Sequence, residues 1–400
     1  MKALASLFIS IAPGAFRILV VWLAAHLYTP QYAAPFTAMY LFATALCMIS
    51  GGGFGLVLIR HSAGSNRKSK VIISLFLLIT GAVTAVLMTV VTIPFLQFEL
   101  LPFLGITTAL SCWQIERHGW IAERKFMFLS LLDLLLVIIL VLTLWTSKLS
   151  IVTALVSSHV VLITVSFLWR FRQTKSGGHP TVWSWSLIWS AIKIGGSTFI
   201  AGGFLMILPA LVESMITPII LTKLSLMVTA VGALFVVPRS YLNLFIGSLA
   251  KVVRARKVDS RIVHTCVRRI HRLGLIMLIP AYLFVLFYLI VSGQQLTPHD
   301  LLLSMTVCSA MVIGQLYLVE GNLLILLQRE NIALISSSVM FVVMLGLAWL
   351  LGQSIEHDYK FLIGLFTCLG LCYSVRWGVY LTILKPYFQK PQKTDKVTKS

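Results

Sequence analysis

Long apolar runs cover most of this chain and exclude most of the ways in which its 400 residues could fold. The sequence is 58% hydrophobic and only 11% charged, whereas soluble domains carry roughly 25% charged residues. A helix needs about 20 apolar residues to cross a bilayer. Windows of this kind lie at 4–28, 36–59, 71–93, 100–115, 126–146, 150–169, 187–212, 225–249, 273–292, 301–327, 331–351 and 361–384. They predict an all-α polytopic membrane protein with about twelve transmembrane helices.

Positive charge is distributed unevenly between the connections. Most of the 32 lysines and arginines lie in alternate connections and near the two ends. These are Lys2, Arg60 to Lys70, Arg117 to Lys125, Arg170 to Lys175, Lys251 to Arg272, Arg329 and Lys385 to Lys399, whereas the other connections hold Lys148, Lys223 and Lys360. The positive-inside rule predicts that both termini are cytoplasmic. Topology and anionic lipids then explain the net charge of +20, so we expect no nucleic-acid partner.

The order of the windows predicts two lobes, because six precede the polar stretch 170–186 and six follow it. We expect an N-terminal six-helix lobe over 1–175, a cytoplasmic linker over 176–186, a C-terminal six-helix lobe over 187–385 and a basic cytoplasmic tail over 386–400. Two lobes around a central cavity are typical of transporters built from repeats. The first window is too long for a secretion signal and Arg17 interrupts it, so we expect it to be retained as a span.

Charged residues inside apolar windows are the candidates for function. Burying a charge in a bilayer costs a few kcal/mol or more, so such residues usually line a polar cavity or pair with each other. The cations are Arg17, Lys193, Arg239 and Arg376, and the acids are Asp133 and Glu320. The excess of cations favours an anionic substrate.

Arginine suits a phosphate-bearing substrate because its guanidinium stays charged and binds phosphate oxygens bidentately. We therefore predict that all four cations bind substrate. Arg17 and Arg239 are the first candidates, the latter because Pro238 favours a kink beside it. Lys193 and Arg376 lie nearer to helix ends, where a long side chain can also reach the membrane surface. The two acids are candidates either for binding a coupling proton or cation, or for ion pairs with the arginines.

The sequence contains no pattern that we can assign to catalysis, a metal or a cofactor. The glycines at 51–53 and 55 lack the Lys-Ser/Thr ending of a nucleotide-binding loop and predict close helix packing instead. The six cysteines lie in spans or a cytoplasmic loop and indicate neither a disulfide framework nor a metal site. Gly195, Gly196, Gly202 and Gly203, with Pro209, make the seventh span the predicted broken helix.

A resemblance to a known family begins at residue 13. Residues 13–70 read PGAFRILVVWLAAHLYTPQYAAPFTAMYLFATALCMISGGGFGLVLIRHSAGSNRKSK. They combine a basic residue in the first span, a short outer turn, a glycine-rich second span and an inner loop that opens with Ile-Arg. Residues 114–126, QIERHGWIAERKF, resemble the family's short basic loop between the fourth and fifth spans. With twelve spans, the whole chain resembles the O-antigen flippases, the polysaccharide translocases of the multidrug/oligosaccharidyl-lipid/polysaccharide transporter superfamily.

The resemblance implies a transport protein and not an enzyme. Its expected activity, in lipopolysaccharide biosynthesis, is to move an undecaprenyl-diphosphate-linked oligosaccharide, the repeat unit of O-antigen or another surface polysaccharide, from the inner to the outer leaflet of the bacterial inner membrane. The expected partners are this lipid-linked substrate, membrane lipids, and a polysaccharide polymerase with its chain-length regulator. Two alternatives stay open. A cation-coupled multidrug antiporter of the same superfamily would favour acids in its cavity, and a membrane-embedded polymerase or glycosyltransferase would be expected to present a large catalytic loop.

Overall fold

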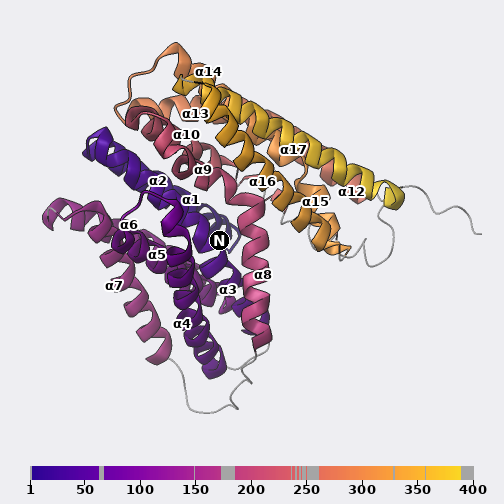
Figure 1. The fold of residues 1–400 in the computed structure, drawn as a ribbon. Helices are drawn as coiled ribbons and strands as arrows, with labels where there is room; N and C mark the ends of the chain where they lie inside the picture. The colour runs from indigo at the N-terminus through magenta and orange to yellow at the C-terminus, as the bar shows by residue number, and fades with distance from the viewer. Residues whose placement is uncertain are drawn as a thin grey trace, which may run out of the picture. The chain divides into compact units, whose positions relative to one another are not determined.

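The computed structural model is helical wherever it describes the chain (Figure 1). It describes residues 2–62, 67–147, 149–172, 185–235, 261–327, 329–355 and 357–388, together with 237, 238, 241, 242, 245 and 249. No strand occurs in this part of the chain. Contacts between Cα atoms divide the chain into two compact units. Unit 1 comprises Met1–Ala233 and Tyr288–Gln295, and unit 2 comprises Leu234–Phe287 and Leu296–Ser400.

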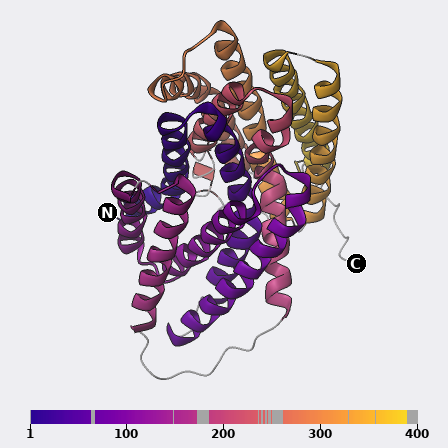
Figure 2. The same cartoon turned by 60° about the vertical axis from the view of Figure 1, so that its left-hand side comes forward.

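Unit 1 is built from the first helices of the chain, drawn from indigo to magenta in Figure 2. They are α1 (Lys2–Leu27), α2 (Pro30–Cys47), a π-helical segment η1 (Met48–Gly53), α3 (Phe54–Ser62), α4 (Arg67–Thr92), a 3₁₀ turn η2 (Ile93–Phe95), α5 (Leu100–Ala122), α6 (Phe126–Ser147), α7 (Ile151–Arg172), α8 (Trp185–Gly202), α9 (Phe204–Val212), a 3₁₀ turn η3 (Glu213–Met215) and α10 (Pro218–Leu234). Helix α5 packs against α4, α2 and α7, so it forms the centre of the unit.

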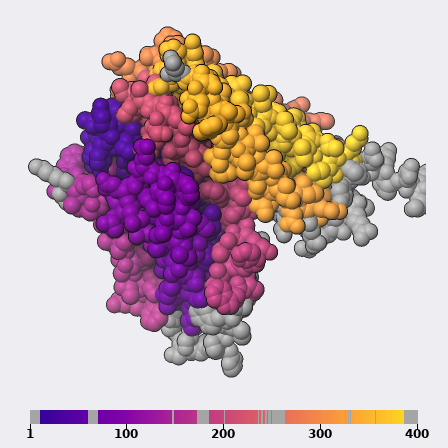
Figure 3. Space-filling view, viewed as in Figure 1, coloured from indigo at the N-terminus to yellow at the C-terminus, as the bar shows by residue number. Residues whose placement is uncertain are grey.

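Unit 2 holds the later helices, drawn from orange to yellow in the space-filling view (Figure 3). They are α12 (Arg261–Ile276), α13 (Leu278–Val291), α14 (Pro298–Leu316), α15 (Leu318–Leu326), α16 (Glu330–Ser354) and α17 (Asp358–Phe388), with the last turn of α13, from Tyr288, belonging to unit 1. A capping box starts α14, because Thr297 and Asp300 bond to each other's backbone N–H groups. Helix α17 packs against α14 and α16.

Every predicted span coincides with helix in the described part of the chain, which confirms the all-α membrane fold. Among the described residues, eight helices are long and apolar enough to cross a bilayer, and two shorter apolar helices lie at Ile11–Leu27 and Pro218–Leu234. The fourth span is longer than predicted, since α5 continues from residue 115 to Ala122. Hydropathy ends this span too early because its last two turns carry charged residues, and these prove to be buried.

The predicted break in the seventh span is confirmed. Helices α8 and α9 meet at an angle of 66° around Gly203. The Gly203 backbone N–H donates to the Phe199 carbonyl oxygen at 2.6 Å, and a Cβ at Gly203 would lie 2.6 Å from the same oxygen. Glycine is therefore the residue that this tight turn accepts. Pro209 lies inside α9, where it removes one backbone donor.

The glycines of the second span also pack closely, as the sequence predicts. A Cβ at Gly53 would collide with the Ala191 carbonyl oxygen of α8. On the facing helix, a Cβ at Gly195 would lie 2.6 Å from both the Cα and the carbonyl oxygen of Ile49. The backbones of η1 and α8 thus touch without side chains between them, the arrangement that small residues permit in membrane proteins.

We expect Gly195→Ala to destabilise unit 1 by about 1–3 kcal/mol, because the added methyl group overpacks a backbone contact. Gly196→Ala is the matched control, since nothing lies within 4 Å of a Cβ at that position. Both substitutions raise helix propensity equally, so only Gly195→Ala should lower the apparent melting temperature of the detergent-solubilised protein. Equal melting temperatures for the two variants would contradict the packing of η1 on α8.

Candidate functional site: an embedded cavity in unit 1

The candidate site is a cavity of about 320 Å³ inside unit 1. Helices α1, α2, α5, α6 and α7 line it. The lining is mostly apolar, with a group of polar side chains. These are Arg17, Tyr40, Thr44, Gln114, Arg117, Asp133 and His159. The described lining residues include two guanidinium groups and one carboxylate, so the formal charge of the lining is positive.

Helix α1 brings Arg17 to the cavity. The Arg17 side chain is 8% exposed, and its Nη1 atom lies 2.9 Å from the Met206 Sδ atom of α9. Sulfur is only a weak acceptor, so this contact does little to offset the cost of burying the charge. Gly14, one turn earlier, lets α1 approach α10, because its Cβ position is 3.4 Å from the Ala233 Cβ atom. The structure thus places Arg17 in the wall of a cavity, while its role in substrate binding stays a prediction.

Asp133 forms a buried ion pair with Arg117. The Arg117 Nε and Nη2 atoms donate to the two carboxylate oxygens of Asp133, both at 2.9 Å. The side chains are 5% and 9% exposed. This is the parallel two-bond geometry that makes arginine pairs strong. Of the two roles predicted for Asp133, the structure therefore shows the ion pair, with Arg117 as the partner.

The sequence assigned Arg117 to a basic cytoplasmic loop, and that interpretation is wrong for residues 114–122. These residues belong to α5, and Glu116, Arg117 and His118 are all buried. The available signal was the spacing of 16 residues between Arg117 and Asp133, which matches two antiparallel helices joined by a short turn. Spacing alone does not reveal which faces of the two helices meet, so the pair could not be derived from it.

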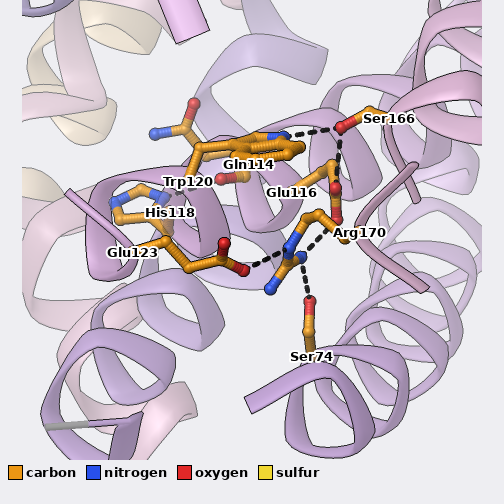
Figure 4. Close-up of polar contacts among 8 residues, drawn as sticks. All are labelled: Ser74, Gln114, Glu116, His118, Trp120, Glu123, Ser166 and Arg170. Carbon is orange, nitrogen blue, oxygen red and sulfur yellow. Dashed lines mark hydrogen bonds and ion pairs between the residues drawn. The ribbon is translucent and has the colours of Figure 1, made fainter. Parts of the chain in front are cut away.

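A second buried network lies between α4, α5 and α7 (Figure 4). Arg170, which is 1% exposed, donates to Glu116 at 2.9 Å, to Glu123 at 3.0 Å and to the Ser74 hydroxyl at 2.9 Å. Trp120 donates to the Ser166 hydroxyl at 2.6 Å, and that hydroxyl donates to Glu116 at 2.7 Å. The network connects three helices through charged side chains that are at most 6% exposed. The sequence assigned Arg170 to a cytoplasmic connection, and the structure corrects this.

The remaining predicted cations lie elsewhere or outside the described residues. Lys193 is exposed on α8, with its Nζ atom 5.5 Å from the centre of the Trp189 ring. It is not part of the cavity lining. Arg239 lies outside the described residues.

Unit 2 holds Arg376 among tyrosines. Arg376 is 5% exposed and donates to the hydroxyl oxygens of Tyr380 at 2.9 Å and Tyr317 at 3.1 Å. Its guanidinium carbon also lies 4.3 Å from the centre of the Tyr317 ring and 5.2 Å from that of Tyr380. Tyrosines therefore satisfy and shield this charge, and no carboxylate forms an ion pair with it in the described part of the chain.

Glu320 is also buried in unit 2, at 1% exposure. Its Oε1 atom accepts a hydrogen bond from Trp377 at 3.3 Å and lies 3.7 Å from the His271 Nε2 atom. Its contacts are therefore a histidine and a tryptophan, not one of the arginines. The two acids predicted together thus belong to different clusters, and of the predicted site residues that the structure describes, only Arg17 and Asp133 line the cavity.

No cluster of three or more potential metal ligands occurs among the described residues. All six cysteines are free thiols.

Comparison with solved structures identifies the fold of this chain. The sequence matches no protein-family profile and no curated protein. Among solved structures, it is similar to an inward-facing multidrug resistance MATE family transporter of the MOP superfamily, with 10% identity, a TM-score of 0.63, and coverage of 97% of this chain and 95% of that one. It is also similar to the lipid II flippase MurJ in an inward closed conformation, with 13% identity, a TM-score of 0.60, and coverage of 96% and 87%.

A third similar structure is a MOP superfamily transporter from Pyrococcus furiosus, with 12% identity, a TM-score of 0.56, and coverage of 97% of this chain and 96% of that one. It is described as having a binding pocket of reverse polarity that suggests a different function. The chain therefore has the fold of these transporters, with about twelve transmembrane helices. Structural similarity at such low sequence identity indicates the fold but not the substrate.

Proposed function

We propose that this chain is a flippase that moves undecaprenyl-diphosphate-linked oligosaccharide, the repeat unit of O-antigen or another surface polysaccharide, from the inner to the outer leaflet. The observation that carries this proposal is the embedded cavity with Arg17 in its lining beside the Arg117–Asp133 ion pair, which leaves the lining with a positive formal charge. A diphosphate that crosses hydrocarbon needs permanent positive charge along its path, and guanidinium groups provide it with bidentate geometry.

The size of the cavity fits one part of such a substrate. At about 320 Å³ it lies at the lower end of the roughly 300–1,000 Å³ typical of small-molecule sites. It can enclose a phosphate and an adjoining sugar, but not a whole repeat unit with its polyprenyl tail. We infer that unit 1 recognises the charged head of the substrate, while the tail stays in the lipid.

The similar structures are consistent with this proposal without deciding it. One of them is a lipid II flippase, and in another the polarity of the binding pocket suggests the function. Among transporters with this fold, the charge of the binding pocket is therefore the property by which their substrates should be compared. The uneven distribution of lysine and arginine between the connections supports cytoplasmic termini in a bacterial inner membrane. Two six-helix lobes, one before and one after residues 176–186, would fit this topology. A polymerase and its chain-length regulator are the partners that would use the exported product.

The alternative is a cation-coupled multidrug antiporter. It is favoured by the likeness to MATE transporters and by the buried carboxylates of Asp133 and Glu320. Both Asp133 oxygens, however, accept hydrogen bonds from Arg117, so this acid is already neutralised and offers little to a cationic drug.

Deletion of the gene should cause complete lipid-linked repeat units to accumulate in the inner leaflet. The reason is that transport stops while synthesis continues. Mass spectrometry of extracted lipids would measure the amount and length of the repeat, and complementation with the intact gene is the control. A repeat that lacks its last sugar would indicate a glycosyltransferase instead. Normal lipid levels combined with new drug sensitivity would indicate the antiporter.

A further inference from the structure

The imidazole of His159 is a polar group of the cavity that phosphate binding does not use. His159 lies on α7, is fully buried and lines the cavity. Its Nδ1 atom is 2.8 Å from the Leu155 carbonyl oxygen. A carbonyl oxygen can only accept a hydrogen bond, so Nδ1 must carry the hydrogen.

This assignment determines what the other ring nitrogen can do. The ring is fully buried, and burial favours the neutral imidazole over the imidazolium. In a neutral ring with hydrogen on Nδ1, the Nε2 atom is an acceptor. Nε2 is buried and has no hydrogen-bond partner among the described residues. An unsatisfied buried acceptor is unfavourable, and a ligand that donates to it removes this cost.

Phe16 packs against the imidazole of His159. The two rings meet edge-on, with centroids 5.5 Å apart at 75°, and Phe16 lines the same cavity. Because Nε2 is covered, a ligand can bond to it only after side chains packed around the imidazole, Phe16 among them, move. Arg17 lines the same cavity as His159, so a phosphate that Arg17 binds there shares the cavity with this ring.

We infer that His159 determines which phosphate compounds the cavity accepts, because its Nε2 atom accepts a hydrogen bond from an O–H or N–H group next to the phosphate. The ligand class is a glycosyl phosphate, in which the first sugar supplies that donor. This inference rests on the proposed function and deepens it: Arg17 recognises the phosphate, and His159 distinguishes a sugar phosphate from a phosphate ester without a donor. A site built to bond a donor rejects analogues that lack it.

Two phosphate monoesters of equal charge test the inference. Glucose 1-phosphate carries sugar hydroxyl groups, and ethyl phosphate carries none. Their dissociation constants would be measured on the purified full chain in nanodiscs. His159→Phe keeps an aromatic ring against Phe16 but removes both nitrogens, so we expect about three- to tenfold weaker binding of glucose 1-phosphate and unchanged binding of ethyl phosphate. His159→Gln offers a new acceptor and should recover part of the loss.

His118→Phe is the matched control. His118 is also buried and its Nδ1 atom contacts the Gln114 carbonyl oxygen at 2.6 Å, but it does not line the cavity. This variant should bind both esters as the unmodified chain does. If His159→Phe binds both esters with unchanged affinity, or weakens both equally, the inference on His159 is overturned and the flippase proposal stands. If the unmodified chain binds neither ester, both the anion-binding cavity and the inference on His159 are overturned.

Discussion

Replacing Arg17 with alanine is expected to reduce export of lipid-linked oligosaccharide by roughly ten- to hundredfold, the loss that follows when a charged hydrogen-bond donor is removed from a binding site. Arg17 lies in the cavity wall and is 8% exposed. Arg17→Lys should retain part of the export, because lysine keeps the charge and loses the bidentate geometry. Export would be measured as surface polysaccharide per unit of membrane-inserted protein.

Protein abundance separates a transport defect from a folding defect. Removing a buried charge should leave membrane insertion intact or improve it. Arg172→Ala is the control, since it removes a cation from an exposed position at the end of α7. We expect it to export normally.

Asp133 provides a second test of the role of Arg17. Both of its carboxylate oxygens bond to Arg117, so Asp133→Asn should not restore export to Arg17→Ala. Full rescue in this double variant would mean that Arg17 serves as the structural partner of Asp133. Unchanged export by the Arg17→Ala variant alone would also contradict the assignment of Arg17 to phosphate binding.

Arg170→Ala should destabilise unit 1 by about 3–5 kcal/mol, the usual cost of removing one partner from a buried ion pair. The substitution leaves Glu116 and Glu123 desolvated without their guanidinium partner, and it removes the connection from α7 to α4 through Ser74. The expected result is a strong decrease in folded protein. Fluorescence-detected size exclusion and the apparent melting temperature of the solubilised chain would measure it.

Two further variants test the cause of this loss. Arg170→Ala combined with Glu116→Gln should recover part of the stability, because the fully buried Glu116 charge is gone, whereas Glu123 keeps the Lys125 ammonium 4.0 Å away. Arg172→Ala removes the same side chain two residues further along α7, at an exposed position, and should not change stability. Equal losses of stability for Arg170→Ala and Arg172→Ala would show that the network in Figure 4 does not stabilise the packing of these helices.

Much of the fold could be predicted because a bilayer imposes one simple rule. A spanning helix must satisfy its own backbone bonds and be apolar for about 20 residues, so hydropathy alone locates it. The break at Gly203 was predictable for a similar reason, since local glycines determine where a helix can turn. The embedded position of Arg17 also follows from its place in an apolar run.

Pairing between helices could not be read in the same way. Arg117 and Arg170 follow apolar runs as loop charges do, yet the structure buries both against carboxylates. Whether such an arginine is buried depends on which helix faces meet and on how far the two helices are shifted along their axes. Both depend on packing across all of unit 1. The sequence by itself determined the helices, their order and the presence of embedded charge, because these depend on each segment and its solvent. Only the tertiary structure decided which charges neutralise each other and which line the cavity, because an ion pair belongs to two segments at once.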